Sequence, residues 1–311
     1  MKRGLASLCA VAAVTGVVAT VTTGCGPGGS DSPGHGRPAA PLTWQQELRV
    51  GDAAQHLTGQ CMKRHGFSYW EDRTLTLRES KPVRYVQDDV AWARTYGYGG
   101  RIDAKNERIH ERNPNGVYRQ SLSASRRTAF DTALDGGADA RTVVAPLPGG
   151  GGEIRRRLGG CTEEAERALY GDPAEWFRTS KVAMGVDSLY SAQLMKDRRL
   201  TAAVRDWARC MKDAGQPYKD PQAARDAVRV STARLGAARA DQAFTAERRT
   251  AVADATCART TSLRSVAEAR ETYYQDRLLD RNAQYGKDVG TFRLLGQQAY
   301  DRAVQIVPER G

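Results

Sequence analysis

Apolar residues recur at helical spacing along most of the chain, and this pattern predicts a mainly α-helical protein. Side chains three and four positions apart lie on one side of an α-helix, so an apolar stripe at that spacing indicates one buried face. The clearest stripe consists of Leu200, Val204, Trp207, Cys210, Met211 and Ala214. A weaker stripe consists of Val50, Ala54, Leu57 and Cys61. We expect both segments to be helices that pack against other elements.

Several further helices are predicted from residues that favour helix ends. Asp172-Pro173 and Asp220-Pro221 each place a capping Asp before a first-turn Pro. Ser123 can begin a helix that ends before Gly136. A short helix can begin at Asp88 or Asp89, either of which would cap it, and end at Gly97.

The last 70 or so residues have the composition of long helices. No Pro or Gly occurs between Thr245 and Gly286, which predicts one helix of about 40 residues, some 60 Å long. A final helix over about residues 289–307 would then fold back on it, with Gly286 and Gly290 at the bend. The apolar stripe of the long helix needs such a partner.

The region between residues 67 and 160 is less regular. Alternating runs at Thr74–Arg78 and Val83–Val86 surround a Pro, which fits either a small hairpin or an extended loop. The glycine-rich stretches at 97–100 and 149–152 lack the spacing that phosphate-binding loops require. We therefore expect both glycine-rich stretches to be ordinary loops.

The amino-terminal segment differs in kind from the rest of the chain. Lys2 and Arg3 precede an apolar stretch from Leu5 to Val21, which is typical of a secretory signal peptide. Gly24-Cys25 follows, and in this respect the chain resembles bacterial lipoprotein precursors. The resemblance implies that residues 1–24 are removed and that Cys25 carries lipid. Ordinary signal-peptidase cleavage and an uncleaved signal anchor are the alternatives, since Thr22 stands where Leu is usual.

Residues 25–41 are then expected to form a lipidated Cys and a flexible tether. Positions 26–41 hold five Gly and four Pro with no large apolar side chain. A flexible chain of this length spans roughly 20–24 Å. The folded part would therefore stay close to the membrane that holds the lipid.

Charge and hydropathy exclude several classes of protein. The mean hydropathy is −0.58, and only the amino-terminal apolar run is long enough to cross a bilayer, so a multi-spanning transporter is excluded. The net charge of +11 falls by two if Lys2 and Arg3 are removed. The remaining basic residues are spread along the chain with no long basic run, and we expect no nucleic-acid partner.

The cysteines predict two disulfide bonds. Cys9 lies in the signal segment and Cys25 would carry lipid, which leaves four in the exported part: Cys61, Cys161, Cys210 and Cys257. An even number in an oxidising compartment indicates disulfides, with three connectivities open. The phrase Cys-Met-Lys-x-x-Gly-x-x-Tyr begins at both Cys61 and Cys210, which suggests a duplication. If each half closes on itself, the pairs are Cys61–Cys161 and Cys210–Cys257.

The sequence contains no catalytic or metal-binding motif that we could assign. A metal site from His56, Cys61 and His65 competes with the disulfide, and we expect no cofactor. The adjacent acids at 88–89 and 163–164 could act in acid–base catalysis only if they converged on a pocket; capping and solvated roles are the alternative. Aromatic residues are dense in one region, where they either fill a small core or face a ligand: Tyr69, Trp70, Tyr85, Trp92, Tyr96 and Tyr98.

Together these features resemble secreted lipoproteins of high-GC Gram-positive bacteria, a resemblance that implies a location and an architecture but no mechanism. We expect disulfide-linked helical half-domains at 42–171 and 172–311, the second with a long helical carboxyl-terminal region. The first functional hypothesis is a non-catalytic binding or scaffold module, held outside the cytoplasmic membrane by lipid, that contacts an envelope polymer or envelope protein. The second is a cell-wall-directed enzyme with its site in residues 67–160.

Overall fold

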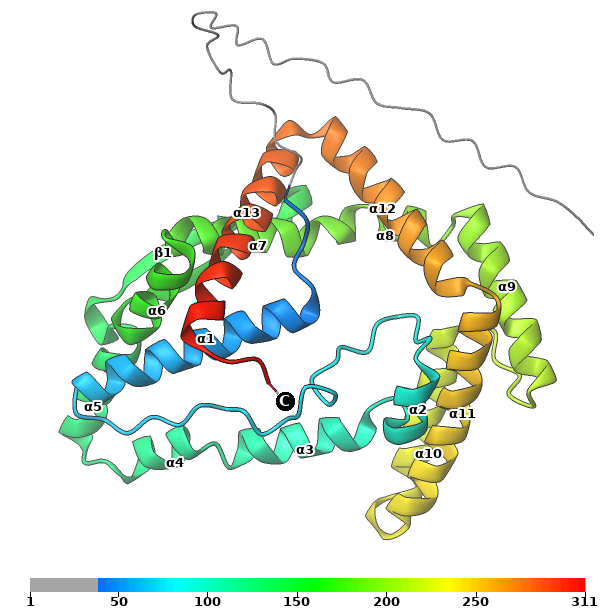
Figure 1. Ribbon diagram of the computed structural model, residues 1–311, viewed down its shortest axis with the longest axis horizontal. Coiled ribbons are helices and arrows are strands. Elements are labelled where there is room, and N and C mark those ends of the chain that lie inside the picture. Colours follow the sequence, from blue (N-terminus) through cyan, green and yellow to red (C-terminus); the bar gives the residue numbers. More distant parts are fainter. Residues whose placement is uncertain (1–38, 311) are drawn as a thin grey trace, which may run out of the picture. The chain divides into compact units, whose positions relative to one another are not determined.

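The computed structural model describes residues 39–310, and in this part of the chain the protein is mainly α-helical with one two-stranded hairpin (Figure 1). The predicted fold class is therefore confirmed. None of the helices within residues 39–310 is both long enough and apolar enough to cross a membrane. The predicted signal peptide and Cys25 lie outside the described residues.

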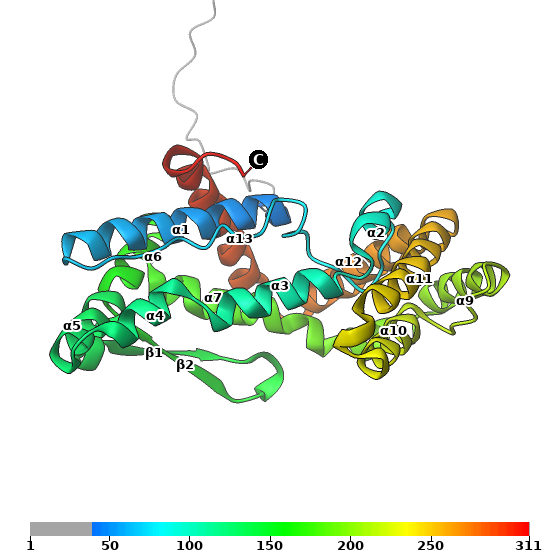
Figure 2. The ribbon, with the colours of Figure 1, turned by 90° about the horizontal axis from the view of Figure 1, so that it is seen from below.

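One group of elements, the first group, surrounds the Cys61–Cys161 disulfide. Helix α13 packs on α1, α6 and α7, and α6 also packs on α1 and α5. Strands β1 and β2 pair antiparallel, with Arg141 opposite Leu158, and β1 lies on α7 (Figure 2). The members are α1 (Trp44–Arg64), α5 (Ala124–Asp135), β1 (Arg141–Pro146), β2 (Glu153–Leu158), α6 (Gly160–Tyr170), α7 (Pro173–Gly185) and α13 (Ala283–Ile306).

A second group surrounds the Cys210–Cys257 disulfide. Helix α11 packs on α2, α9 and α10, and α12 packs on α9. The members are α2 (Val90–Tyr96), α9 (Arg198–Asp213), α10 (Pro221–Leu235), α11 (Ala240–Thr260) and α12 (Leu263–Arg281). Three short helices lie along the connections between the groups: α3 (Gly100–Glu111), α4 (Pro114–Ser121) and α8 (Ser191–Leu194).

Each half of the sequence contributes helices to the other group: the first half contributes α2, and the second half contributes α7 and α13. Helix α2, from the first half, packs on α11, and α13, from the end of the chain, packs on α1 (Figure 1). The described residues 39–310 accordingly belong to one compact unit. The boundary expected between residues 171 and 172 falls between α6 and α7, which pack on each other.

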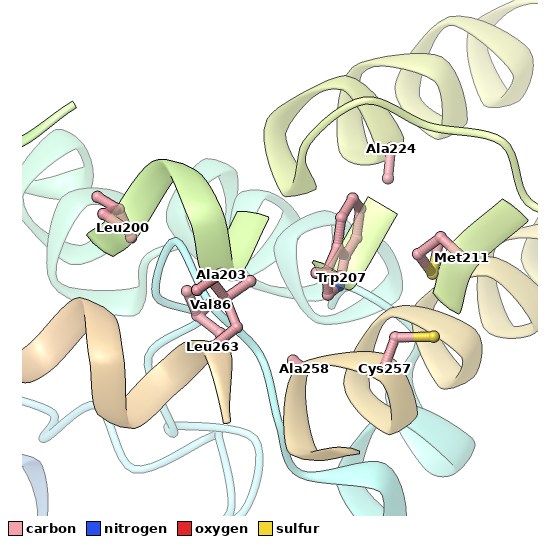
Figure 3. Close-up of a cluster of buried hydrophobic side chains, with 9 residues drawn as sticks. All are labelled: Val86, Leu200, Ala203, Trp207, Met211, Ala224, Cys257, Ala258 and Leu263. Atoms are coloured by element: carbon pink, nitrogen blue, oxygen red, sulfur yellow. The ribbon is translucent and has the colours of Figure 1, made fainter. Parts of the chain in front are cut away.

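The core of the second group is built on α9, the helix with the clearest apolar stripe. Trp207 and Met211 are fully buried, and Leu200 is 3% exposed. Figure 3 shows Trp207 between Ala224 of α10 and the residues of α11 and α12. Val86, from the loop before α2, packs into the same cluster. The stripe seen in the sequence therefore faces a core made from four other segments.

The repeated Cys-Met phrase forms the same structure twice. Cys61 is joined to Cys161 and Cys210 to Cys257, as closure within each half predicted. In both copies the phrase ends its helix, and the Gly five positions after the Cys has a left-handed backbone, with φ of 76° at Gly66 and 73° at Gly215. The next residue donates its N–H to the Met carbonyl in each case, at 3.0 Å and 2.8 Å. The duplication thus includes the helix stop as well as the disulfide.

The helix starts expected from capping residues are confirmed. Asp89 caps α2, Ser123 caps α5, Asp172 caps α7 and Asp220 caps α10, each by accepting a backbone N–H in the first turn. Such caps satisfy N–H groups that have no partner inside the helix. Local chemistry alone was therefore sufficient to find these boundaries.

The hairpin considered for residues 74–86 does not form there. That segment is a loop with turns, and the Nε1–H of Trp92 donates to the Arg78 carbonyl at 2.9 Å. The hairpin lies instead at β1 and β2, around the glycine-rich loop at 149–152. Those strands were missed because the second is rich in charged residues and shows no clear alternation.

The single helix expected from residue 245 is interrupted, which corrects that prediction. Helix α11 ends at Thr260, and Ser262 has a φ of 54° before α12 begins. The hydroxyls of Thr260 and Thr261 bond to carbonyls four residues back, and such hydroxyl residues weaken a helix interior. The chain turns again at Asn282, whose side chain caps α13. Gly286 and Gly290 lie inside α13 and not at a bend.

Replacing Gly290 by Ala distinguishes a bend from a helix interior. No heavy atom lies within 4 Å of the position that a Cβ would take, and the backbone is helical. We expect Gly290→Ala to raise the free energy of unfolding by about 0.5–1 kcal/mol, because Ala favours the helix. Urea denaturation followed by circular dichroism measures this. A loss of stability would contradict the helical assignment at this position.

Candidate functional site

A pocket of about 460 Å³ lies between α1, α7 and α13, a volume typical of small-molecule sites. We call it the α7 pocket. Tyr170 and Arg156 approach it from α6 and β2. Its lining consists of Pro41, Leu42, Glu47, Val50, Arg156, Tyr170, Trp176, Phe177, Ser180, Lys181, Met184, Phe292, Arg293 and Gly296.

Stacked aromatic rings form one wall of the α7 pocket. The ring centroids of Tyr170 and Trp176 are 3.9 Å apart with an interplanar angle of 9°. Those of Trp176 and Phe292 are 4.9 Å apart at 15°. The three rings come from three different helices, so the stack also holds α6, α7 and α13 together. Burial and the nearby carboxylates Glu47 and Glu166 raise the pKa of Tyr170, which keeps its hydroxyl neutral.

Basic side chains lie beside this apolar wall. Lys181 and Arg293 form no ion pair with any residue between 39 and 310; the Lys181 Nζ lies 5.6 Å from the Phe177 ring centroid, and Arg293 donates to the neutral Gln275. Arg156 is paired with Glu166, yet its buried Nε has no hydrogen-bond partner in the described part of the protein. The pocket can therefore place an anion next to an apolar body.

Glu47 is the one carboxylate in this lining. Partial burial raises its pKa, while the charge of Arg84 lowers it. The same lining holds Lys181 and Arg293, neither of which has an ion pair within residues 39–310. These two cations outnumber the single carboxylate, so the balance of charge in the α7 pocket is positive.

Helix α7 supplies five of the pocket residues, more than any other element. Asp172 and Pro173 fix the first turn, and Phe177, Lys181 and Met184 then follow at spacings of four and three residues on one side of the helix. Ser180 donates its hydroxyl proton to the Phe177 carbonyl at 2.8 Å, so this proton is not available to a ligand, although the oxygen can still accept a hydrogen bond. The cap seen in the sequence therefore sets the direction of the pocket wall.

Sequence reasoning did not find the α7 pocket. The adjacent Trp176 and Phe177, in the first turn of a capped helix, were the available signal. Their partners lie far away in the sequence, and Phe292 is 116 positions from Trp176. Apolar spacing alone does not indicate which helices meet.

The predicted site residues occupy separate places. The two disulfides use Cys61, Cys161, Cys210 and Cys257. His65 lies with its ring nitrogen within 4.8 Å of both sulfurs of the first bond, but oxidised sulfurs are not thiolate ligands. His56 Nδ1 lies 2.8 Å from Glu71 Oε1, so these residues do not gather around a single ion position.

The adjacent acids have cap and ion-pair roles. Asp89 caps α2 and pairs with Lys81, and Asp88 pairs with Arg264 at 2.7 Å. Glu163 pairs with Arg141 and with a residue on its own helix, and its neighbour Glu164 pairs with Arg64. These carboxylates do not converge on one pocket.

The aromatic residues between 69 and 98 also divide among different places. Trp92 is 2% exposed, Tyr85 packs on the core of the second group, and Tyr69 packs on the core beside the first disulfide. Trp70 is 43% exposed and makes an edge contact with Tyr118. Most of them therefore belong to cores, the first of the two readings that the sequence left open.

A buried polar cluster joins α2, α9 and α11. Asp254 is fully buried and accepts hydrogen bonds from the Tyr98 hydroxyl and the Trp207 Nε1–H, both at 2.9 Å. Burial raises the pKa of Asp254 to about 6, although these two bonds and the nearby Arg225 lower it. Burial and the Asp254 charge also raise the pKa of Tyr98. The cluster ties the turn after α2 to the second disulfide's helices.

The stability of the fold should depend on the ionisation of Asp254. Its folded pKa of about 6 exceeds the ordinary 3.8, so the stabilisation from its proton is complete below about pH 4 and is lost as the pH rises through 6. Asp254→Asn remains neutral throughout. From pH 4 to pH 7, its free energy of unfolding should rise by about 2 kcal/mol relative to the unchanged protein. Urea denaturation at each pH measures this. The prediction would be contradicted if the free energies of unfolding of the two proteins changed equally with pH.

Comparisons with known proteins add no relative. No protein-family model matches the chain, and no curated protein or solved structure matches it. A function therefore has to be inferred from the residues of this chain.

Proposed function

We propose that the protein is a lipid-anchored, extracytoplasmic binding module that acts at the cell envelope without catalysis, and that the α7 pocket is its binding site. The observation that carries this proposal is the composition of the pocket wall. It combines stacked aromatic rings with two basic side chains, Lys181 and Arg293, that have no ion pair within residues 39–310. Such a surface binds and orients a ligand by apolar contact and charge.

The location of the pocket supports the link to an anchor. Pro41, at the end of the expected tether, and the adjacent Leu42 both line the pocket. A flexible tether of 16 residues would place this wall at a root-mean-square distance of roughly 20–24 Å from a lipid on Cys25. The disulfides are compatible with an oxidising compartment.

The anchor is tested by replacing Cys25. In a bacterial host that processes lipoproteins, the Cys25→Ala protein should leave the membrane fraction, while the unchanged protein stays there and carries diacylglycerol on its amino-terminal peptide by mass spectrometry. Cys9→Ala is the matched control, because that residue lies within the segment that would be removed. A Cys25→Ala protein that remains membrane-bound would contradict the proposed anchor.

Binding at the pocket is tested by photo-crosslinking in cells. A photoreactive benzoylphenylalanine replaces Met184, which is 68% exposed and lines the pocket. The control places it at Val230 of α10, which is 47% exposed. We expect an adduct of defined mass from position 184 alone. The absence of adducts, or identical adducts from both positions, would contradict a binding role for the pocket.

A further inference from the structure

The apolar part of the α7 pocket is suited to a single hydrocarbon chain. Trp176 has both ring faces covered, one by Tyr170 and one by Phe292, so the stack presents a wide apolar wall and no open indole face. Leu42, Val50 and Met184 extend this wall. A volume of about 460 Å³ accommodates one flexible chain more readily than a bulky polymer.

Sugars are disfavoured by the polar groups at the same site. Binding of sugar hydroxyls needs several hydrogen-bond acceptors, yet the described lining has no Asp, Asn or Gln, and Glu47 is its single carboxylate. The Ser180 hydroxyl already donates to a backbone carbonyl. What remains at the wall is mainly positive charge, which favours an anion.

Two cations stand where they can hold an anionic head group. Lys181 and Arg293 come from facing helices, α7 and α13, and both lack an ion pair among residues 39–310. Glu47 is the single carboxylate of the lining, so the two cations outnumber it. A carboxylate or phosphate head group would gain charge-assisted hydrogen bonds here.

We infer that the α7 pocket binds an anionic single-chain amphiphile, a fatty-acid carboxylate or a single-chain alkyl phosphate, with the chain along the Tyr170–Trp176–Phe292 wall and the head group at Lys181 and Arg293. This inference rests on the proposed function, since it names the ligand class of the same site. The pocket lies beside the end of the tether, so a ligand released from the membrane surface would meet it at short range. The ligand would contact the basic and the apolar residues of the pocket at the same time.

The test uses the full-length mature chain with Cys25→Ala, so that no attached lipid competes. Isothermal titration calorimetry compares three probes with the same twelve-carbon chain below their micelle concentrations: dodecanoate, dodecyl maltoside and dodecyltrimethylammonium. Dodecyl phosphate and acetate complete the set. We expect one dodecanoate or dodecyl phosphate per protein, with affinity at least about tenfold above that of the neutral and cationic probes. Acetate, which lacks the chain, should not bind.

Variants locate the binding. Lys181→Gln should weaken dodecanoate binding by about tenfold and leave dodecyl maltoside unaffected, because the substitution removes one charge. Met184→Glu, at a position 68% exposed, should weaken it similarly by repulsion. Lys212→Gln on α9 is the matched control and should bind as the parent does. Circular dichroism confirms that each variant is folded.

Several results would overturn the inference. These are the absence of saturable dodecanoate binding, equal affinity for the anionic, neutral and cationic head groups, or a Lys181→Gln protein that binds dodecanoate as tightly as the parent. They leave the binding module itself intact if the crosslink at position 184 still forms with another class of molecule. Conversely, if the protein binds dodecanoate but is never lipidated in cells, the binding inference would hold and the proposed anchor would be contradicted.

Discussion

Replacing Cys61 and Cys161 together by Ala should lower the free energy of unfolding by about 5 kcal/mol, because the bond closes a loop of about 100 residues in the unfolded chain. Both sulfurs are buried, so the change adds a small cavity and no exposed thiol. The second bond spans 47 positions, and its double Ala variant should lose about 4 kcal/mol. Urea denaturation of the oxidised proteins measures both.

Reduction provides the control for this prediction. Dithiothreitol should destabilise the parent strongly, and it should affect each double variant only through the one bond that remains. A Cys61→Ala, Cys161→Ala protein with the urea midpoint of the parent would show that the long loop is already constrained in the unfolded state. Expression in a reducing cytosol should likewise yield less stable protein.

Arg310→Met should destabilise the protein by about 3 kcal/mol, because it leaves a buried carboxylate without a partner. Asp52 is 2% exposed, and Arg310 donates to its Oδ2 at 2.7 Å and to its Oδ1 at 2.5 Å. The same guanidinium donates to the Leu75 carbonyl at 2.8 Å. Thermal or urea denaturation measures the loss.

A double variant separates the charge from the packing. Asp52→Asn combined with Arg310→Met has no buried charge, so it should be more stable than Arg310→Met alone, a non-additive result. Arg209→Met is the matched control, because Arg209 and Asp206 are exposed partners on one helix, and such pairs contribute less than about 1 kcal/mol. Equal losses at positions 209 and 310 would contradict the role of burial.

The sequence predicts what depends on neighbouring residues. Caps such as Asp172 and the stop at Gly215 satisfy backbone groups within one turn, so they could be found without knowledge of the fold. The disulfide pairing followed because the duplicated phrase placed equivalent cysteines in both halves. In each case the physical cause lies within a few positions or in a visible repeat.

The predictions that failed concern features set by contacts between residues far apart in the sequence. Only weak helix formers at 260–262 indicate that the long helix is interrupted, and no Gly or Pro is present. The α7 pocket combines residues of the tether, α1, β2, α6, α7 and α13, and the pairing of these elements is set by packing. The hypothesis of a site within residues 67–160 rested on the local density of aromatic residues. Most of these residues pack in the cores.

The exchange of helices between the two halves of the sequence has a consequence for how the chain folds. Helix α13 completes the packing of α1, and Arg310 neutralises Asp52 near the other end of the sequence. A polypeptide that emerges from the ribosome with its amino end first therefore cannot complete the packing of α1 until residues 283–310 have been made. A premature stop codon that removed these residues would damage the beginning of the fold as much as its end.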